Sequence, residues 1–295
     1  MDSFLHDLSW VLPLRSEAAT AIANGFTWLG YAPFFIIALP VVYWLWDKRI
    51  GVHLALVVVL TAVSNGLLKD IFDDPRPPVG FAVDPRVGDS YGLPSGHAQI
   101  AVAMWFWIAF ELRRGWAWGA AAFIALGVCL SRLYLGVHDV EDVLAGAILG
   151  VATLLVFAWA ISPHFAWWRA LPAARQIGVL LAVQVPLYLL WPEPGGPGGV
   201  FAVGGMLVGW WGGALLERQA IRFRRHPNWL VAVGTTVAVV AICFFALTRI
   251  GAGLAVLGVP ALAGAWAQYL VIGLFVTALG PWIAQRLGLA GRAGP

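Results

Sequence analysis

Charged residues are scarce in this 295-residue chain: Lys, Arg, Asp and Glu together make up 11% of it, against roughly a quarter in soluble domains. Hydrophobic residues account for 61%, and the mean hydropathy is +0.82. A chain with so little polar surface cannot cover itself in water, so the composition excludes an ordinary soluble domain and indicates an integral membrane protein. Seventeen tryptophans agree with this, because indole rings favour the membrane–water boundary.

Cysteine is nearly absent as well. Cys129 and Cys243 both lie inside apolar runs, with no CxxC pair and no Cys/His spacing typical of zinc sites. The sequence therefore excludes a disulfide framework and a structural zinc site. The first ten residues lack the basic stretch of a secretory signal, so we expect no cleaved signal peptide.

Apolar stretches long enough to cross a bilayer recur along the chain. We expect about nine spans, at Phe26–Trp46, Gly51–Leu68, Ala98–Leu112, Trp116–Leu133, Val140–Ile161, Ile177–Trp191, Val200–Leu216, Trp229–Leu247 and Leu262–Ala284. The predicted fold is all-α, a polytopic bundle of transmembrane helices, with a surface helix before Phe26 that Pro13 interrupts. Residues 1–162 would hold about five spans, and residues 163–295 about four more whose role the sequence does not reveal.

The basic residues indicate the orientation, because cytoplasmic loops collect Lys and Arg. With nine spans, twelve of the eighteen fall on one side: Lys48, Arg49, Arg113, Arg114, Arg169, Arg175, Arg218, Arg222, Arg224, Arg225, Arg286 and Arg292. The other six are Arg15, Lys69, Arg76, Arg86, Arg132 and Arg249. We therefore expect the N-terminus outside and the C-terminus inside. Topology alone does not explain why Lys69, Arg76 and Arg132 lie on the outer side, close to the ends of membrane spans.

Three short motifs share the outer side in this topology. They are Lys69–Pro77 after the second span, Pro94–His97 at the start of the third, and Ser131–Asp142 between the fourth and fifth. Since all three lie at one membrane face, helix packing can bring their side chains into a single cleft. The sequence thus predicts one composite site rather than three separate features.

The predicted cleft favours a tetrahedral anion. Lys69, Arg76 and Arg132 supply three cations, two of them planar forks suited to phosphate oxygens. Ser95 offers a hydroxyl donor, and Gly96 permits close backbone approach where a helix begins and its free N–H groups attract anions. Donors arranged in this way would stabilise the charge that builds up during phosphoryl transfer.

Two histidines supply the remaining chemistry. His138 and Asp142 are four residues apart, on one face if a helix begins there, so the carboxylate can bind one ring nitrogen and leave the other free to attack phosphorus. His97 is suited to protonate the leaving oxygen and then to activate water. No carboxylate cluster with metal-ligand spacing accompanies them, so we expect no metal and no other cofactor.

These residues resemble the signature of the type 2 phosphatidic acid phosphatase superfamily, which also includes vanadium haloperoxidases and glucose-6-phosphatase. That signature, K-x6-RP, PSGH and SR-x5-H-x3-D, is complete here, and the resemblance covers roughly residues 26–162. It implies a helical phosphatase core and a phosphohistidine mechanism without metal. Carried over by position, His138 resembles the nucleophile, Asp142 its orienting partner and His97 the general acid–base. The implied phosphate ligands are Lys69, Arg76, Ser95, Gly96 and Arg132.

Two features depart from many relatives. The stretch between the third-motif histidine and aspartate holds Asp139 and Glu141 rather than proline, and about four spans follow Ile161, beyond the usual six-helix core. The extra carboxylates tune the anion site or are simply solvated. The extra spans suit a scaffold, a dimer contact or a lipid-binding wall, and the oligomeric state stays open.

A site at the outer face implies a lipid phosphate in the outer leaflet as the partner, with surrounding membrane lipids and no nucleic acid. We expect undecaprenyl diphosphate at a bacterial inner membrane, with the active site facing the periplasm. Phosphatidic acid, phosphatidylglycerol phosphate and a soluble sugar phosphate are the alternatives. A lipid transporter or scramblase is the rival from another class, but it leaves the paired histidines unassigned. Vanadate-dependent oxidation and an inactive relative are weaker rivals.

Overall fold

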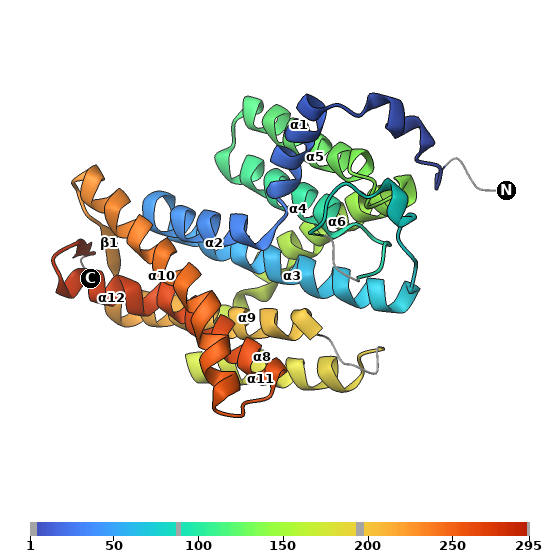
Figure 1. The fold of residues 1–295 in the computed structure, drawn as a ribbon. Coiled ribbons are helices and arrows are strands. Elements are labelled where there is room, and N and C mark those ends of the chain that lie inside the picture. Colours follow the sequence, from blue (N-terminus) through green and yellow to red (C-terminus); the bar gives the residue numbers. More distant parts are fainter. Residues whose placement is uncertain (1–4, 87–89, 193–197, 294–295) are drawn as a thin grey trace. The chain divides into compact units, whose positions relative to one another are not determined.

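The computed structural model describes residues 5–86, 90–192 and 198–293. The chain is mostly helical, as predicted, and divides into two compact units (Figure 1). Unit 1 comprises Met1–Phe35 and Leu60–His164, and unit 2 comprises Ile36–Val59 and Phe165–Pro295. The division passes through two helices, α2 (Ala32–Val41) and α3 (Lys48–Phe72), so each of them runs from one unit into the other.

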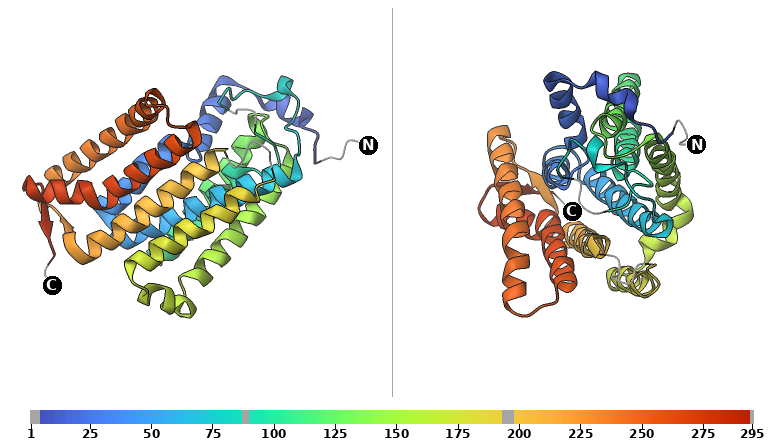
Figure 2. Two further views of the ribbon diagram at one scale, coloured as in Figure 1. Left: turned by 90° about the horizontal axis from the view of Figure 1, so that it is seen from below. Right: turned by 45° about the vertical axis from the view of Figure 1, so that its right-hand side comes forward.

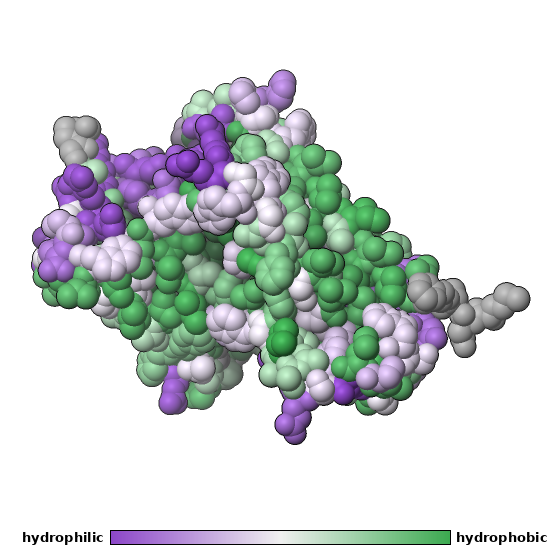
Figure 3. All heavy atoms as spheres, turned by 90° about the horizontal axis from the view of Figure 1, so that it is seen from above, coloured by the Kyte–Doolittle hydropathy of each residue, from purple (hydrophilic) through white to green (hydrophobic). Residues whose placement is uncertain are grey.

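Within the described ranges, six helices are long and apolar enough to cross a membrane, or up to eight spans if each of two bent helix pairs counts as one. Apolar side chains also cover much of the face drawn in Figure 3. These findings confirm a polytopic helical membrane protein. The number nine and the outer N-terminus stay predictions. The third predicted span falls in α4 (Gly96–Leu112), which has 17 residues.

The N-terminal region departs from the prediction. A short 3-10 turn, η1 (Ser9–Leu14), contains Pro13 and is followed by α1 (Glu17–Trp28). The single span expected over Phe26–Trp46 is instead a helix pair, α1 followed by α2 and its π-helical end, bent by 55° at the break. The break contains Gly30, and Pro33 follows it. Glycine is a weak helix former, and proline fits only the first turn of the helix that follows.

Unit 1 is built around α4. The helices α5 (Gly115–Tyr134) and α6 (Val140–Ala160) pack on it, and α1 packs on α5 (Figures 1 and 2). The short turn η3 (Val79–Phe81) lies in the α3–α4 connection. Gly146 and Gly150 let α6 approach α4 closely: a Cβ at Gly146 would overlap the Ser95 carbonyl oxygen, and one at Gly150 would lie 2.7 Å from the Gln99 oxygen. The two glycines thus hold the starts of α6 and α4 together.

A buried polar cluster connects three helices of unit 1. The side-chain amide of Gln99 on α4 donates to Ser64 Oγ on α3 at 2.8 Å and to Thr153 Oγ1 on α6 at 3.0 Å. Asn65 on α3 donates to the carbonyl oxygen of Pro94 at 3.0 Å. Hydrogen bonds of this kind fix the rotation of helices that apolar packing alone leaves loosely specified.

Unit 2 holds the remaining elements. They are η2 (Val42–Trp46), η4 (Pro163–Phe165) at its boundary, α7 (Ala166–Ala170), α8 (Ala173–Leu189), α9 (Gly198–Leu216), η5 (Glu217–Ile221), α10 (Trp229–Val256), α11 (Ala261–Leu274), η6 (Phe275–Leu279) and α12 (Gly280–Arg286). The helices α9 and α11 form its closest pair. A Cβ at Gly273 of α11 would lie 2.7 Å from the Trp210 nitrogen of α9, so small residues bring the two backbones together.

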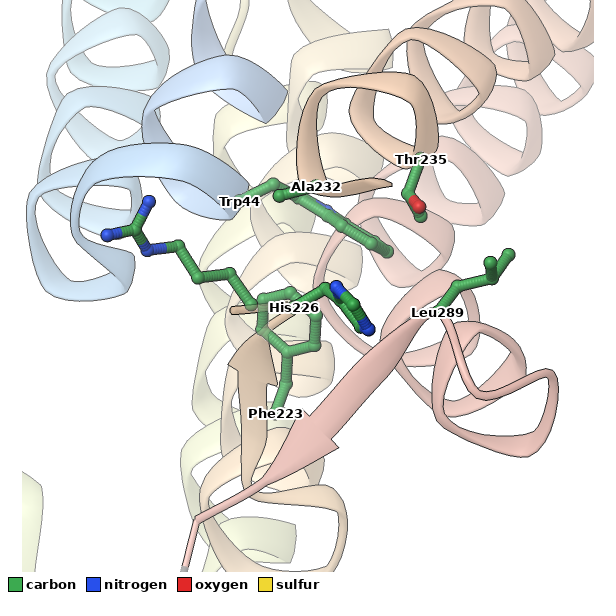
Figure 4. Close-up of a pocket in the computed structure, with 7 residues that line it drawn as sticks. Trp44, Phe223, His226, Ala232, Thr235 and Leu289 are labelled. Carbon is green, nitrogen blue, oxygen red and sulfur yellow. The ribbon is translucent and has the colours of Figure 1, made fainter. Parts of the chain in front are cut away.

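The end of unit 2 that carries η2 and η5 contains a half-buried ion pair and a small sheet. Lys48 Nζ lies 2.6 Å from Glu217 Oε1, and the Glu217 side chain is only 2% exposed. The strands β1 (Phe223–Arg225) and β2 (Ala290–Arg292) pair antiparallel, which the all-α prediction did not include. Figure 4 shows the indentation beside β1, where Trp44, Phe223 and His226 lie near Thr235 and Leu289.

Candidate active site

His138 lies in the turn between α5 and α6, and Asp142 lies in the first turn of α6. Asp139 is the N-cap of α6: its side chain accepts from the Asp142 amide at 2.9 Å, and Asp142 Oδ2 lies 3.3 Å from the Asp139 amide. The same Asp142 oxygen lies 2.9 Å from His138 Nδ1. Since a carboxylate accepts, Nδ1 carries the proton and Nε2 keeps its lone pair. The helix cap therefore also orients the histidine.

Arg76 is held directly beside that lone pair. Its Nη1 lies 3.2 Å from His138 Nε2 and donates to the Val137 carbonyl at 2.7 Å. Its Nε donates to the Ser90 carbonyl at 2.6 Å, and its Nη2 to Ser90 Oγ at 2.9 Å. Four contacts fix the guanidinium, so a phosphate bound to Arg76 would sit next to Nε2.

The electrostatics keep His138 neutral. Its side chain is 2% exposed, and burial, together with the charges of Arg76, Arg132 and Lys69, holds its pKa well below the usual value. Burial and the charge of Arg132 lower the pKa of Arg76 to about 10, so the guanidinium stays protonated at neutral pH. A neutral imidazole thus faces a permanent cation, which suits a nucleophile that attacks a phosphate.

The second motif forms the start of α4. Ser95 is the N-cap residue, but its hydroxyl does not cap the helix. Its Oγ is buried without a hydrogen-bond partner among the described residues. The Ser95 amide donates to the Asp142 carbonyl at 2.9 Å, which joins this motif to the third. At Gly96 a Cβ would lie 2.9 Å from Asn65 Oδ1, so this position is tightly enclosed. The first N–H groups of α4 have no partner within the helix and favour an anion.

Lys69 lies in the last turn of α3 and holds the segment that leads to α4. Its Nζ donates to the carbonyls of Tyr91 and Gly92, the latter at 2.9 Å. Gly92 in turn lies against Asp142, since a Cβ there would be 3.0 Å from Asp142 Oδ2. In this structure the Lys69 side chain therefore holds the loop that leads to α4.

Arg132, in the last turn of α5, is 1% exposed. Its Nη1 donates to Thr27 Oγ1 and lies 3.4 Å from Asp84 Oδ2, whereas its Nε is buried with no partner in the described part of the chain. His97 Nε2 is likewise buried and unpartnered there. Together with Ser95 Oγ, these atoms are buried polar groups of a kind that natural proteins rarely leave unsatisfied.

Unit 1 thus contains all eight residues that the sequence singles out. Direct contacts join Arg76, His138 and Asp142, and a backbone bond adds Ser95. The sequence reasoning missed several residues that contact the site, among them Thr27, Tyr31 and Asp84. None of these three belongs to a motif, and no spacing relates them to the motif residues, so no signal in one sequence could have identified them.

Comparisons with known proteins match part of the chain. The PAP2 superfamily model matches residues 50–166. Human sphingosine-1-phosphate phosphatase 2 is 31% identical over 56% of this chain and 43% of its own length. Bacitracin transport permease protein BcrC of Bacillus licheniformis is 29% identical, over 44% and 66%. Dolichyldiphosphatase of Saccharomyces cerevisiae is 27% identical, over 32% and 45%.

The chain spans about half the length of the first curated relatives that it matches. Within the matched residues lie all three motifs, with their order and spacing intact. The motif residues all lie in unit 1, and the protein is integral to a membrane. Over residues 50–166, the chain is similar to the PAP2 superfamily.

Proposed function

We propose that the chain hydrolyses the phosphate ester or diphosphate of a membrane lipid through a phosphohistidine at His138. The observation that carries this is the oriented, neutral imidazole of His138, whose Nε2 faces Arg76 at 3.2 Å. The names of two relatives, a sphingosine-1-phosphate phosphatase and a dolichyldiphosphatase, support the same class of reaction.

The first step transfers the phosphoryl group to the enzyme. The Nε2 lone pair of His138 attacks phosphorus, and the bond from phosphorus to the leaving oxygen breaks. Asp142 holds the Nδ1 proton and stabilises the positive ring that forms. His97 donates a proton to the leaving oxygen. Arg76, Arg132, Ser95 and the first N–H groups of α4 would hold the equatorial oxygens.

The second step returns the enzyme to its starting state. His97, now lacking that proton, takes one from water, and the hydroxide attacks the phosphorus of phosphohistidine. The bond between phosphorus and Nε2 breaks, and inorganic phosphate leaves. This sequence uses side chains of the chain alone. In the described residues, no group of three or more His, Cys, Asp or Glu side chains could hold a metal ion.

The membrane setting favours a lipid substrate. Three of the helices that carry the site, α3, α5 and α6, are long and apolar enough to cross a bilayer, and the PAP2 match covers residues 50–166. Among lipid phosphates we propose an isoprenoid diphosphate, undecaprenyl diphosphate, as the first candidate, presented at the periplasmic face of a bacterial inner membrane. Dolichyldiphosphatase among the relatives supports that chemistry. A sphingoid phosphate is the second candidate, favoured by the sphingosine-1-phosphate phosphatases.

A transporter is the rival function, and one relative carries the name of a transport permease. Transport gives no role to a histidine whose tautomer is fixed by a carboxylate and whose free nitrogen faces an arginine. Hydrolysis explains both contacts, so the structure of the site favours an enzyme.

The test is phosphate release by purified protein in detergent. We would supply undecaprenyl diphosphate, sphingosine 1-phosphate, phosphatidic acid, phosphatidylglycerol phosphate and glucose 6-phosphate in turn, with and without EDTA. We expect release from at least one lipid, unchanged by EDTA and abolished by His138→Ala. Full activity in that variant, or loss on chelation, would overturn the mechanism. Preference for glucose 6-phosphate would overturn the lipid assignment alone.

A further inference from the structure

The break between α1 and α2 forms one wall of the site. Tyr31 lies in this break, and its ring meets the His97 imidazole edge to face, with centroids 4.5 Å apart. The guanidinium of Arg132 lies 5.9 Å from the centre of the same ring. Tyr31 thus touches two residues of the proposed chemistry, although it precedes the first motif by nearly forty positions.

Asp84 lies behind Arg132 and is fully shielded, with 0% of its side chain exposed. Its Oδ2 accepts from the Tyr31 hydroxyl at 2.5 Å and lies 3.4 Å from Arg132 Nη1. Its Oδ1 accepts from Arg86 Nε at 2.7 Å and from the Arg86 amide at 3.1 Å. Both oxygens are therefore occupied, and the carboxylate has a fixed orientation.

Asp84 is charged at neutral pH. Its burial raises the pKa, but hydrogen bonds from Arg86 and Tyr31 outweigh that effect and lower the pKa to about 2. Arg132 is 1% exposed, and a buried guanidinium without a counter-ion is strongly unfavourable. When no phosphate is bound, Asp84 supplies the opposite charge that keeps Arg132 in place.

We infer that Tyr31 and Asp84 are positioning residues of the active site: Asp84 orients the Arg132 guanidinium, and Tyr31 links Asp84 to the His97 ring. This rests on the proposed phosphatase activity. Neither residue touches the reacting atoms, so each acts through another group. With Nη1 directed to Thr27 and Asp84, the buried, unpartnered Nε of Arg132 is a donor available to a phosphate oxygen.

Two variants separate the contributions. Tyr31→Phe keeps the ring on His97 and removes only the hydroxyl that orients Asp84, with no change of charge. We expect it to weaken orthovanadate binding about 3–10-fold and to lower kcat/KM by a similar factor, the scale of one lost hydrogen bond that acts through a neighbouring residue. Asp84→Asn removes the counter-ion. We expect kcat to fall at least tenfold with KM unchanged or lower, because a repulsion on the bound phosphate disappears as well.

Tyr134→Phe is the matched control. The Tyr134 hydroxyl also makes hydrogen bonds within unit 1, to Ser16 and to Thr20 at 3.0 Å, but none to the site. Its loss should leave vanadate binding and the kinetic constants within twofold of the unsubstituted protein. Thermal unfolding of all variants would show that any difference at the site is not a general loss of structure.

The decisive comparison uses the Arg132→Gln background. If Tyr31 acts through Arg132, Tyr31→Phe should change vanadate affinity there by less than twofold. The same fold-loss with and without Arg132, or wild-type affinity and kinetics for both Tyr31→Phe and Asp84→Asn, would overturn the inference. Vanadate binding reports on positioning even if no lipid is hydrolysed. Failure of the unsubstituted protein to release phosphate would therefore count against the proposed function alone.

Discussion

Gly30 lies directly against the imidazole of His97. A Cβ at this position would be 2.8 Å from Cγ of His97 and closer still to Cδ2, so no side chain fits between the helix break and the ring. The contact leaves the ring little freedom to turn. Since Tyr31 packs on the same imidazole, two consecutive residues of the break determine where the proposed acid–base stands.

The contact between Gly30 and His97 predicts the effect of adding one methyl group at position 30. Gly30→Ala should push the His97 ring aside and lower kcat at least tenfold, because general acid–base catalysis depends on geometry. Gly25→Ala in α1 is the control, since a Cβ there meets nothing within 4 Å. Steady-state kinetics on the best lipid substrate would test this. Equal activities for the two variants would contradict the assigned role of His97.

The contact between Asp142 and His138 predicts that Asp142→Asn loses activity. Asp142→Asn has nearly the same shape but no charge, so it can no longer stabilise the positive ring or select the tautomer with a proton on Nδ1. We expect kcat to fall on the order of 10²–10⁴-fold, as for carboxylates that orient a catalytic histidine. Rapid-quench detection of phosphohistidine should show slower formation. A normal rate of formation would rule out this role for Asp142.

Because its pKa is low, the His138 imidazole should not titrate near neutral pH. Burial and nearby cations lower this pKa well below the usual value, so the ring should remain neutral from about pH 6 to 8. Histidine NMR of the unliganded protein, assigned by loss of a signal in His138→Gln, should show no titration in that range. A midpoint near the model-peptide value would contradict the electrostatic picture of the site.

The contacts of His6 with Asp139 and Glu141 should depend on pH. The Nδ1 of His6 lies 2.7 Å from Asp139 Oδ2, and its Nε2 lies 3.3 Å from Glu141. The hydrogen bond to Asp139 and the Asp139 charge raise the pKa of His6. A raised folded-state pKa means that the contact is fully formed below about pH 6.5 and weakens as pH rises through the folded value.

Hydrogen exchange of the segment around His6 would check this. Protection relative to His6→Gln should be greatest at acidic pH and should disappear at alkaline pH. The variant itself should show no such difference beyond the intrinsic pH dependence of exchange. Equal protection of both proteins at every pH would refute the contact.

The Lys48–Glu217 pair predicts a loss of stability in unit 2. Glu217 is buried and also accepts from the Phe223 amide at 2.7 Å. Lys48→Met leaves this carboxylate without its cation and should destabilise the fold by about 1–3 kcal/mol, seen as a lower Tm. The double variant with Glu217→Gln should recover part of the loss. A Tm for the double variant below that of Lys48→Met would argue against the ion pair.

The motif residues could be predicted because their chemistry is local in sequence. The i, i+4 spacing of His138 and Asp142 leads directly to the observed 2.9 Å contact, and the Ser-Gly-His sequence predicts the helix start at Gly96. The helical membrane class follows from composition alone. These features depend only on composition or on residues that lie within a few positions of each other.

Other features could not be predicted because they depend on tertiary packing. Nothing in the apolar run from Phe26 to Trp46 shows that Gly30 and Pro33 divide it into two bent helices. Asp84 is a single acidic residue in a loop, and only the folded chain brings it to Tyr31 and Arg132. The β1–β2 pair joins segments more than sixty residues apart.

The position of the α1–α2 break sets a lower limit on the size of an active fragment. The family match begins at residue 50, whereas Thr27, Gly30 and Tyr31 all precede it. A chain shortened to residues 50–166 would keep every signature residue and still lose the hydroxyl that holds Arg132 and the wall behind His97. For this protein, the residues of the PAP2 signature are fewer than the residues that build the candidate active site.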